Sequence, residues 1–311
     1  MATSPKVSVL MSIYRPDAGY LAEQLETIDA QTFDDFEVVV YNDCPTDRSW
    51  EGFCREHCAG HPLRYVQGGT NRGYVKAFEY LVGLAEGEYI ALCDQDDRWL
   101  PGRLAAGVAA LDEGYVLACC DRQVIDGKGT VTVESWRAAH SGDATCTWAS
   151  GDYITPQAAF ACYSIGMATM VRADVARALA PFPTCTGHDK WLALGASQMG
   201  PCANIEEPLV QYRQHGSNQT GTLRGIGSKD DWRRKRVEDS HELVEVFARR
   251  FPDAPDLPDM CAFAQARLAG DVRGMWCHRN LAPQVARFEI ALHFTPDWVF
   301  RALLRLMRRG R

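Results

Sequence analysis

Residues 7–112 alternate between short apolar runs and segments whose apolar residues recur at helical spacing. The apolar runs, which predict strands, cover residues 7–14, 36–40, 63–66 and 89–93. The segments between them predict helices at 20–31, 47–58 and 73–85, with another helix starting near Pro101. Strands separated by helices of this length are joined by right-handed crossovers and pair in parallel. The alternation therefore predicts an α/β fold, a Rossmann-like, mainly parallel sheet flanked by helices.

After residue 115 the alternation becomes less regular. Strand-like runs at 115–124 and 205–212 flank a helix-like segment at 190–198. Residues 135–158 are rich in Ser, Gly, Thr and Asp, so we expect a long loop there that serves the substrate. Beyond about residue 230 the pattern is helical throughout. The second half therefore predicts the end of the α/β part, followed by a helical extension.

Composition and charge narrow the class of protein. A chain of 311 residues with 46% hydrophobic and 23% charged residues is typical of a globular protein with one large domain, or one domain with an appendage. The net charge of −7 argues against nucleic acid as a partner. No apolar run reaches the roughly 18 residues of a transmembrane helix. The start, Met-Ala-Thr-Ser-Pro-Lys-Val, lacks the regions of a signal peptide, so we expect a cytoplasmic protein.

Twelve cysteines are a high count for such a chain. Cys54 and Cys58 lie close to His57 and His61, and these four side chains are candidate zinc ligands. No second cysteine pair with suitable spacing accompanies them. Buried reduced thiols are the alternative, and we favour it for a cytosolic protein.

Polar and acidic residues follow three of the predicted strands. These strand ends read Ser12-Ile13-Tyr14, Asn42-Asp43-Cys44 and Asp94-Gln95-Asp96-Asp97. Ligands of parallel sheets bind beyond the carboxyl ends of the strands. The sequence therefore predicts a binding site at this edge.

The third of these strand ends carries three carboxylates within four residues, Asp94, Asp96 and Asp97. Like charges this close repel one another, and a hard divalent cation would relieve the repulsion. In an extended segment Asp94 and Asp96 point to the same side and Asp97 to the other. The alternative is that Asp97 caps the helix near Pro101 and the other two are solvated loop residues.

At this point the chain resembles family 2 glycosyltransferases, nearest to the bacterial branch labelled rhamnosyltransferases. The resemblance covers about residues 5–221 and depends on motifs that fall in the family's order. They are "VSVLMSIYRP", "FEVVVYNDCPTD", "GGTNRGYVKAFEYL", "YIALCDQDDRWLPGRL", "GHDKWLAL" and "YRQHGSNQTG". It implies a GT-A catalytic domain over residues 1–225. The nucleotide-binding part would end near 125, the acceptor part would cover 126–225, and a helical region would follow over 226–311.

The resemblance also implies an activity. It is the inverting transfer of a sugar from a nucleotide diphosphate sugar to a glycan hydroxyl, aided by Mg²⁺ or Mn²⁺. We favour dTDP-L-rhamnose as donor, with a UDP-hexose as the alternative. The acceptor would be a polyprenyl-linked glycan in cell-surface polysaccharide synthesis at the inner face of the membrane.

The resemblance assigns roles to particular residues. Asp96 and His215 would bind the metal. Asp43 would read the nucleotide base, Arg72 would face the diphosphate, and Asp94 would hold the ribose or the donor sugar. The donor-binding residues together are Ser12, Tyr14, Asp43, Asn71, Arg72, Asp94 and Arg213. Asn218 would help Arg213 to hold phosphate, and Gly216 and Gly221 would let this loop close over the donor.

Asp189 is the candidate general base, because a carboxylate must take the proton of the attacking hydroxyl. The alternative is a helix N-cap. Two positions depart from many relatives: His188 precedes Asp189 where Glu is common, and Asn42 precedes Asp43 where Asp is common. The second departure leaves base recognition to Asp43 alone.

The last segment predicts an amphipathic helix that begins at Thr295-Pro296-Asp297. Its apolar positions are Val299, Ala302, Leu303, Leu306 and Met307, and Arg301, Arg305 and Arg308 lie opposite. Residues 296–311 would lie on an anionic membrane, or would pack on protein instead.

Three other functions compete with this one. A nucleotidylyltransferase needs a Gly-rich loop after the first strand, and "SIYRPDAGY" has one Gly. A haloacid-dehalogenase-type phosphatase carries its paired aspartates after the first strand, not the fourth. A non-catalytic nucleotide-sugar-binding or scaffold protein remains the alternative, although Asp96, Asp189 and His215 are all present.

Overall fold

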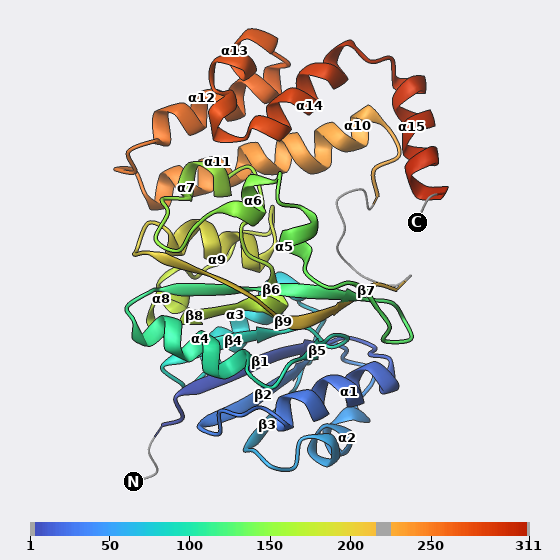
Figure 1. Cartoon of the computed structure of the whole chain (residues 1–311), viewed down its shortest axis with the longest axis vertical. Coiled ribbons are helices and arrows are strands. Elements are labelled where there is room, and N and C mark those ends of the chain that lie inside the picture. The colour runs from blue at the N-terminus through green and yellow to red at the C-terminus, as the bar shows by residue number, and fades with distance from the viewer. Residues whose placement is uncertain (1–3, 216–224, 310–311) are drawn as a thin grey trace. The chain divides into compact units, whose positions relative to one another are not determined.

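The computed structural model describes residues 4–215 and 225–309 (Figure 1). The chain divides into two compact units. The first comprises Met1–Ile154 and Tyr163–Gly216, and the second comprises Thr155–Cys162 and Ser217–Arg311.

Four parallel strands form one half of the sheet in the first unit. They are β1 (Val7–Ile13), β2 (Phe36–Asn42), β3 (Leu63–Gln67) and β4 (Tyr89–Cys93), in the order β3-β2-β1-β4. The crossover helices are α1 (Ala18–Asp29), α2 (Trp50–His57) and α3 (Tyr74–Leu84). These elements confirm the predicted alternation to within a few residues. β1, β2 and β4 are buried on both faces, as their near-continuous apolar sequences require, whereas β3 is only half-buried at the end of the strand order.

The other half of the sheet is mixed. It contains β5 (Arg98–Trp99), β6 (Leu117–Ile125), β7 (Val131–Val133), β8 (Thr169–Arg172) and β9 (Cys202–Arg213). β8 lies antiparallel between β4 and β6, whereas β6 and β9 pair in parallel. The sheet is therefore parallel over its first four strands and mixed beyond them. Three of these strands escaped prediction because two to four residues are too few to show a period.

The remaining helices of the first unit flank this sheet (Figure 1). They are α4 (Arg103–Asp112), α8 (Ala173–Ala178) and α9 (His188–Ala196), with a 3₁₀ turn, η1, at Gly166–Ala168. α4 begins after Gly102 rather than at Pro101.

The expected long loop at 135–158 is wrong in part. Three single-turn helices interrupt it: α5 (Trp136–Ala139), α6 (Ala144–Thr147) and α7 (Thr155–Ala158). The Ser135 side chain accepts a hydrogen bond from Ala138 N, and Asp143 accepts one from Thr145 N. The polar residues that predicted a loop therefore cap short helices.

The second unit is helical, as predicted for the C-terminal region (Figure 1). Besides α7 it contains α10 (Lys229–Trp232), a π-helical segment η2 (Arg233–Glu238), α11 (Asp239–Arg250), α12 (Leu257–Ala269), α13 (Val272–Cys277), η3 (Arg279–Leu281), α14 (Pro283–Phe294) and α15 (Asp297–Arg309). Phe247, Met260 and Phe263 form part of its buried interior. Within residues 4–215 and 225–309, no helix has the length and apolar character needed to cross a membrane.

Candidate active site

The sheet register brings the predicted strand ends together at one edge. Ile13 lies opposite Asn42 in the β1–β2 pair, and Met11 lies opposite Cys93 in the β1–β4 pair. Asp43 and Asp94 therefore leave the sheet at the same edge. This is the crevice beyond the carboxyl ends of parallel strands where ligands of such sheets bind.

Asp43 is buried and anchors the start of α3. Its Oδ1 accepts a hydrogen bond from Arg72 N at 2.7 Å, and its Oδ2 accepts one from Gly73 N at 2.9 Å. Gly73 has φ +74°, a left-handed conformation that glycine adopts without strain. An ionised carboxylate has about four acceptor positions, so Asp43 keeps capacity for a ligand donor.

The segment after β3 orients Asn71 and Arg72. Arg72 Nε donates to the Tyr41 hydroxyl at 3.0 Å, and its guanidinium lies 4.6 Å from the centre of the Tyr80 ring. The Asn71 side chain accepts from Gly73 N at 2.8 Å. Both residues remain exposed at the edge of the sheet.

A residue that the sequence did not single out, Gln95, ties two strand ends together. Its Oε1 accepts from Tyr14 N at 2.8 Å. Ser12 is half-buried at the end of β1, and the Tyr14 side chain is exposed beside it. The sequence did not indicate this role, because Gln95 is an uncharged residue between the carboxylates Asp94 and Asp96.

The Asp94 carboxyl has a strongly raised pKa. Burial raises the pKa of its carboxyl to about 7, with further increases from the negative charges of Asp96 and Asp189. The carboxylate of Asp189, on α9, therefore acts electrostatically on the acidic motif. Perturbed carboxyls that gather in this way are characteristic of functional sites.

Asp189 lies in the first turn of α9, but it is not the N-cap. The N-cap is Gly187, which corrects the alternative considered for Asp189. The Asp189 carboxylate accepts from Lys190 N at 2.8 Å and from Gly166 N at 3.2 Å. These two bonds hold it in place while leaving acceptor capacity for a hydroxyl proton.

His188 is buried next to Asp189 and stacks on Phe78, with ring centroids 4.0 Å apart. Burial lowers the pKa of its imidazole. The ring is therefore a packing element in its neutral form, and Asp189 remains the acid–base candidate of this turn.

Asp96 and His215 meet at the same edge. His215 Nε2 lies 2.9 Å from Asp96 Oδ2, and both side chains are largely buried. Two neighbouring ligands of an octahedral ion, each about 2.1 Å from it, lie about 3 Å apart. A carboxylate with an imidazole also suits Mn²⁺ chemically. The pair therefore fits a divalent cation, although no cluster of three or more His, Cys, Asp or Glu ligands occurs in the described part of the chain.

The structure argues against the phosphate-binding role predicted for Arg213. The residue is 1% exposed, and its Nη2 pairs with Glu23. Its Nε donates to the carbonyl oxygen of Asp96 at 2.9 Å. Arg213 thus faces the protein, because a buried guanidinium needs its counter-charge.

The alternative role of Asp97 as the cap of the helix near Pro101 is wrong. Its Oδ1 accepts a hydrogen bond from Arg213 N at 2.8 Å, and the N-cap of α4 is Gly102. Burial raises the pKa of the Asp97 carboxyl well above its usual range. The remaining loop residues of this prediction, Gly216, Asn218 and Gly221, lie outside the described residues.

The alternative zinc site does not form among the described residues. Cys54 and Cys58 are buried, and burial raises the pKa of each thiol to about 12. His57 Nδ1 lies 2.9 Å from Glu26, and His61 stacks on Phe36. All twelve cysteines are free thiols. Eight are buried, as the favoured alternative expects, whereas Cys185 is half-buried and Cys162, Cys261 and Cys277 are exposed.

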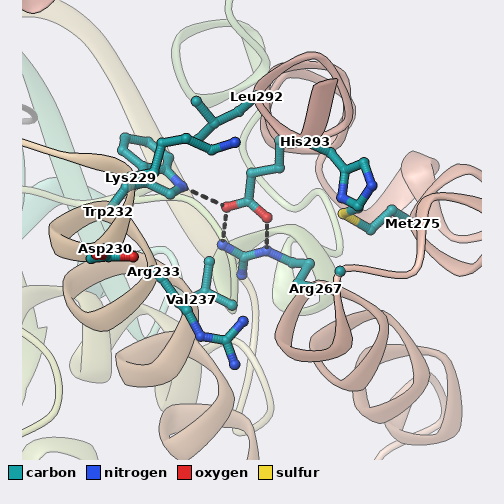
Figure 2. A pocket seen from close by; sticks show the side chains of 11 residues that line it. Lys229, Asp230, Trp232, Arg233, Val237, Arg267, Met275, Leu292 and His293 are labelled. Carbon is teal, nitrogen blue, oxygen red and sulfur yellow. Dashed lines mark hydrogen bonds and ion pairs between the residues drawn. The ribbon is translucent and has the colours of Figure 1, made fainter. Parts of the chain in front are cut away.

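The helical unit has a cavity of its own, of about 370 Å³ (Figure 2). The buried Glu289 carboxylate pairs through both oxygens with Arg267, at 2.7 and 2.9 Å, and accepts from Trp232 Nε1 at 3.1 Å. Figure 2 draws these bonds as dashed lines at Arg267 and Trp232. Lys229 Nζ donates to the Thr295 carbonyl. These charges are satisfied within the unit, so the cavity is a weaker candidate than the sheet edge.

Comparisons with known proteins agree with this geometry. The model of the family "Glycosyl transferase family 2" matches residues 8–169, more than half of the 311 residues. An Escherichia coli K12 protein provisionally named as the colanic acid biosynthesis glycosyl transferase WcaA is 32% identical over 109 residues, 33% of this chain and 38% of that protein. The chain spans less than half the length of the first curated relatives that it matches.

Solved structures show the same fold. The S. aureus protein TarS 1–349 with UDP-GlcNAc superimposes with a TM-score of 0.63 at 16% identity, over 98% of this chain and 92% of that one. The mannosyltransferase PcManGT of Pyrobaculum calidifontis, with GDP-Man and Mn²⁺, gives 0.55 at 22% identity, over 99% and 80%. The fold is therefore GT-A, a mixed sheet flanked by helices, with a helical C-terminal region.

Proposed function

Because the chain belongs to glycosyl transferase family 2, we propose that it transfers a sugar, with inversion, from a nucleotide diphosphate sugar to a glycan hydroxyl. One observation carries this proposal: His215 Nε2 lies 2.9 Å from Asp96 Oδ2 at the edge of the sheet, and the charge of Asp189 is near enough to raise the pKa of Asp94. An inverting transfer needs a proton acceptor on the face of the sugar opposite the leaving diphosphate, and positive charge beside the diphosphate. Asp189 would supply the first, and a cation held by Asp96 and His215 would supply the second.

For donor binding, we propose a role for each residue at this edge of the sheet. Asp43 accepts a hydrogen bond from the nucleotide base, beside Ser12 and Tyr14. Asn71 and Arg72 face the phosphates, and Asp94 holds the ribose or the donor sugar. These assignments are supported by the position of the residues at one edge of the sheet and by the orienting bonds described above.

Asp96 and His215 would hold Mg²⁺ or Mn²⁺. The bound cation would supply positive charge that stabilises the leaving nucleoside diphosphate. Asp189 takes the proton from the acceptor hydroxyl as that oxygen attacks the anomeric carbon. Its bonds from Lys190 N and Gly166 N fix the carboxylate for this step.

For the donor we propose dTDP-L-rhamnose, with a UDP-hexose as the second candidate. The structures that share the fold were solved with UDP-GlcNAc and GDP-Man, so the fold accommodates different nucleotide sugars. The choice of donor therefore depends on local residues at the base pocket. We assign residues 1–225 to the catalytic domain and 226–311 to a helical region.

For the acceptor we propose a polyprenyl-linked glycan of a surface polysaccharide, which the name of the Escherichia coli relative supports. The same proposal places α15 on an anionic membrane. Phe300 and Leu304 of α15 pack on Ile226, Leu292 and Trp232 of its own unit. Three apolar side chains of the predicted face remain exposed: Leu303 at 49%, Leu306 at 64% and Met307 at 56%.

The test is a panel of dTDP- and UDP-sugars offered to the purified protein with Mn²⁺ or Mg²⁺. The expected result is metal-dependent release of one nucleotide, which Asp96→Asn abolishes. Asp189→Asn should keep donor binding while losing transfer, because it removes the base and leaves the donor pocket. Donor binding without any turnover in the unmodified protein would instead support a non-catalytic, nucleotide-sugar-binding member of the fold.

A further inference from the structure

Three separate parts of the first unit meet at the buried side chain of Arg213. Its backbone N donates to Asp97 Oδ1 at 2.8 Å, and its Nε donates to the Asp96 carbonyl at 2.9 Å. Its Nη2 pairs with Glu23 of α1. The end of β9 is thus fastened both to the acidic motif and to α1.

Glu23 holds a second guanidinium as well. Arg98 of β5 donates to Glu23 Oε2 through Nε at 2.8 Å and Nη2 at 2.7 Å. β5 and β9 are paired, with Arg98 opposite Gln211. One carboxylate therefore neutralises two arginines on neighbouring strands, and it does so at the surface, where Glu23 is 39% exposed.

Tyr20, one helical turn before Glu23, completes the arrangement. The centre of its ring lies 4.4 Å from the Arg213 guanidinium and 5.2 Å from the His215 ring. The Tyr20 hydroxyl donates to the Gly127 carbonyl at 3.1 Å. α1 therefore contacts both Arg213 and the histidine two residues further along the chain.

We infer that the Glu23–Arg213 pair is a positioning element that sets the 2.9 Å separation of Asp96 and His215. The Arg213 guanidinium fixes the backbone of Asp96, and Arg213 lies two residues before His215 in the chain. Arg213 therefore fixes the Asp96 and His215 side chains relative to each other. Neither member of the pair contacts the cation. The inference rests on the proposed function, in which Asp96 and His215 share one metal ion.

The physical reason is the cost of an uncompensated buried charge. Without the Glu23 carboxylate, the buried Arg213 guanidinium keeps its charge but loses the carboxylate with which its Nη2 pairs. The guanidinium would then turn toward solvent and release the Asp96 carbonyl. Partners of this kind commonly change metal affinity by 10–100-fold when they are lost.

The experiment measures Mn²⁺ binding to the full chain by electron paramagnetic resonance, with UDP and with dTDP as well as with Mn²⁺ alone. Spin-echo modulation from ¹⁴N reports whether the His215 imidazole is bound to Mn²⁺. Glu23→Gln is compared with Glu51→Gln, which removes an equivalent carboxylate from the exposed Glu51–Arg55 pair. We expect Glu23→Gln to weaken Mn²⁺ binding about tenfold and to reduce the ¹⁴N signal, with Glu51→Gln unchanged.

A second variant guards against a folding defect. Arg213→Lys keeps the charge but loses the fork that reaches Glu23 and the Asp96 carbonyl together, so it should also reduce the ¹⁴N signal. Unchanged Mn²⁺ affinity and ¹⁴N signal in both variants would overturn the inference and leave the metal site standing. If the unmodified protein gave no ¹⁴N signal that His215→Ala removes, the metal site and the inference would both fall.

Discussion

His215 Nε2 lies 2.9 Å from Asp96 Oδ2, although 119 residues separate them in the chain. Asp96 follows β4, and His215 follows β9, the last strand of the sheet in chain order. Their contact joins the acidic motif after β4 to the segment that follows β9. The separation also matches that of two neighbouring ligands of a small divalent cation.

The first prediction concerns this pair. Asp96→Asn and His215→Ala should each lower the transfer rate by about 10²–10³-fold, since the charge on the leaving diphosphate would lose its counter-charge. They should also weaken Mn²⁺ binding, which titration calorimetry measures. Asp174→Asn is the matched control, because Asp174 pairs with Arg172 on the surface, away from the sheet edge. Equal rates for Asp96→Asn and the control would contradict the assignment.

Much of this site could be predicted from the sequence, because it follows from strand ends. An apolar strand that stops in acidic residues, as before Asp94, gives both the element and the edge at which its carboxylates lie. The direction in which a side chain points could not be predicted in the same way. The phosphate-binding role predicted for Arg213 missed its true partner, the Glu23 carboxylate of α1, because that residue lies 190 positions away in the chain. Glu23 looked like any polar position of an amphipathic helix.

The second prediction concerns pH and Asp94. The folded-state pKa of about 7 lies above the ordinary value of 3.8, so between these pH values the folded chain binds more protons than the unfolded one. The Asp94 carboxyl therefore contributes most to the free energy of unfolding at low pH, and this contribution should fall as pH rises from about 4 to 7. Asp94→Asn removes this loss and should be more stable than the unmodified protein at pH 8, by up to about 4 kcal/mol.

Urea denaturation at several pH values, without divalent cations, measures this difference. Asp174→Asn again serves as control, because the Arg172 hydrogen bond lowers the pKa of the Asp174 carboxyl. That variant should gain no stability at pH 8. A stability gain of Asp94→Asn that is independent of pH would argue against the raised pKa.

The third prediction concerns the Arg267–Glu289 ion pair of the helical unit (Figure 2). Glu289→Gln leaves the Arg267 guanidinium buried without its counter-charge and should cost about 3–5 kcal/mol in the free energy of unfolding. Glu238→Gln breaks the half-exposed Glu238–Arg233 pair of the same unit and should cost no more than about 1 kcal/mol. Urea denaturation followed by circular dichroism measures both. Similar costs for the two variants would mean that water reaches the Arg267 site.

The last prediction concerns the exposed face of α15. The sequence predicted an apolar face that includes Leu303, Leu306 and Met307, and these three side chains remain exposed. The side chains of α15 that pack inside the unit are Phe300 and Leu304, which lie outside the predicted face. Arg301 and Arg305 are exposed on the same helix, so the helix offers apolar surface together with positive charge. This combination binds anionic lipid surfaces.

The double variant Leu303→Ser with Leu306→Ser should lower binding to vesicles that contain phosphatidylglycerol by at least about tenfold, since two apolar side chains would no longer enter the lipid. Trp276→Ser is the control, because Trp276 is an exposed apolar residue of the same unit outside α15. Co-sedimentation with vesicles measures binding, and high salt should weaken it by screening the arginines. If the unmodified protein ignored the vesicles but formed a dimer that the double variant disrupts, the exposed face would be an interface between two copies instead. Because both leucines lie outside the packed Phe300–Leu304 side of the helix, the variant should leave the fold of the unit intact, so a loss of binding would report on the surface alone.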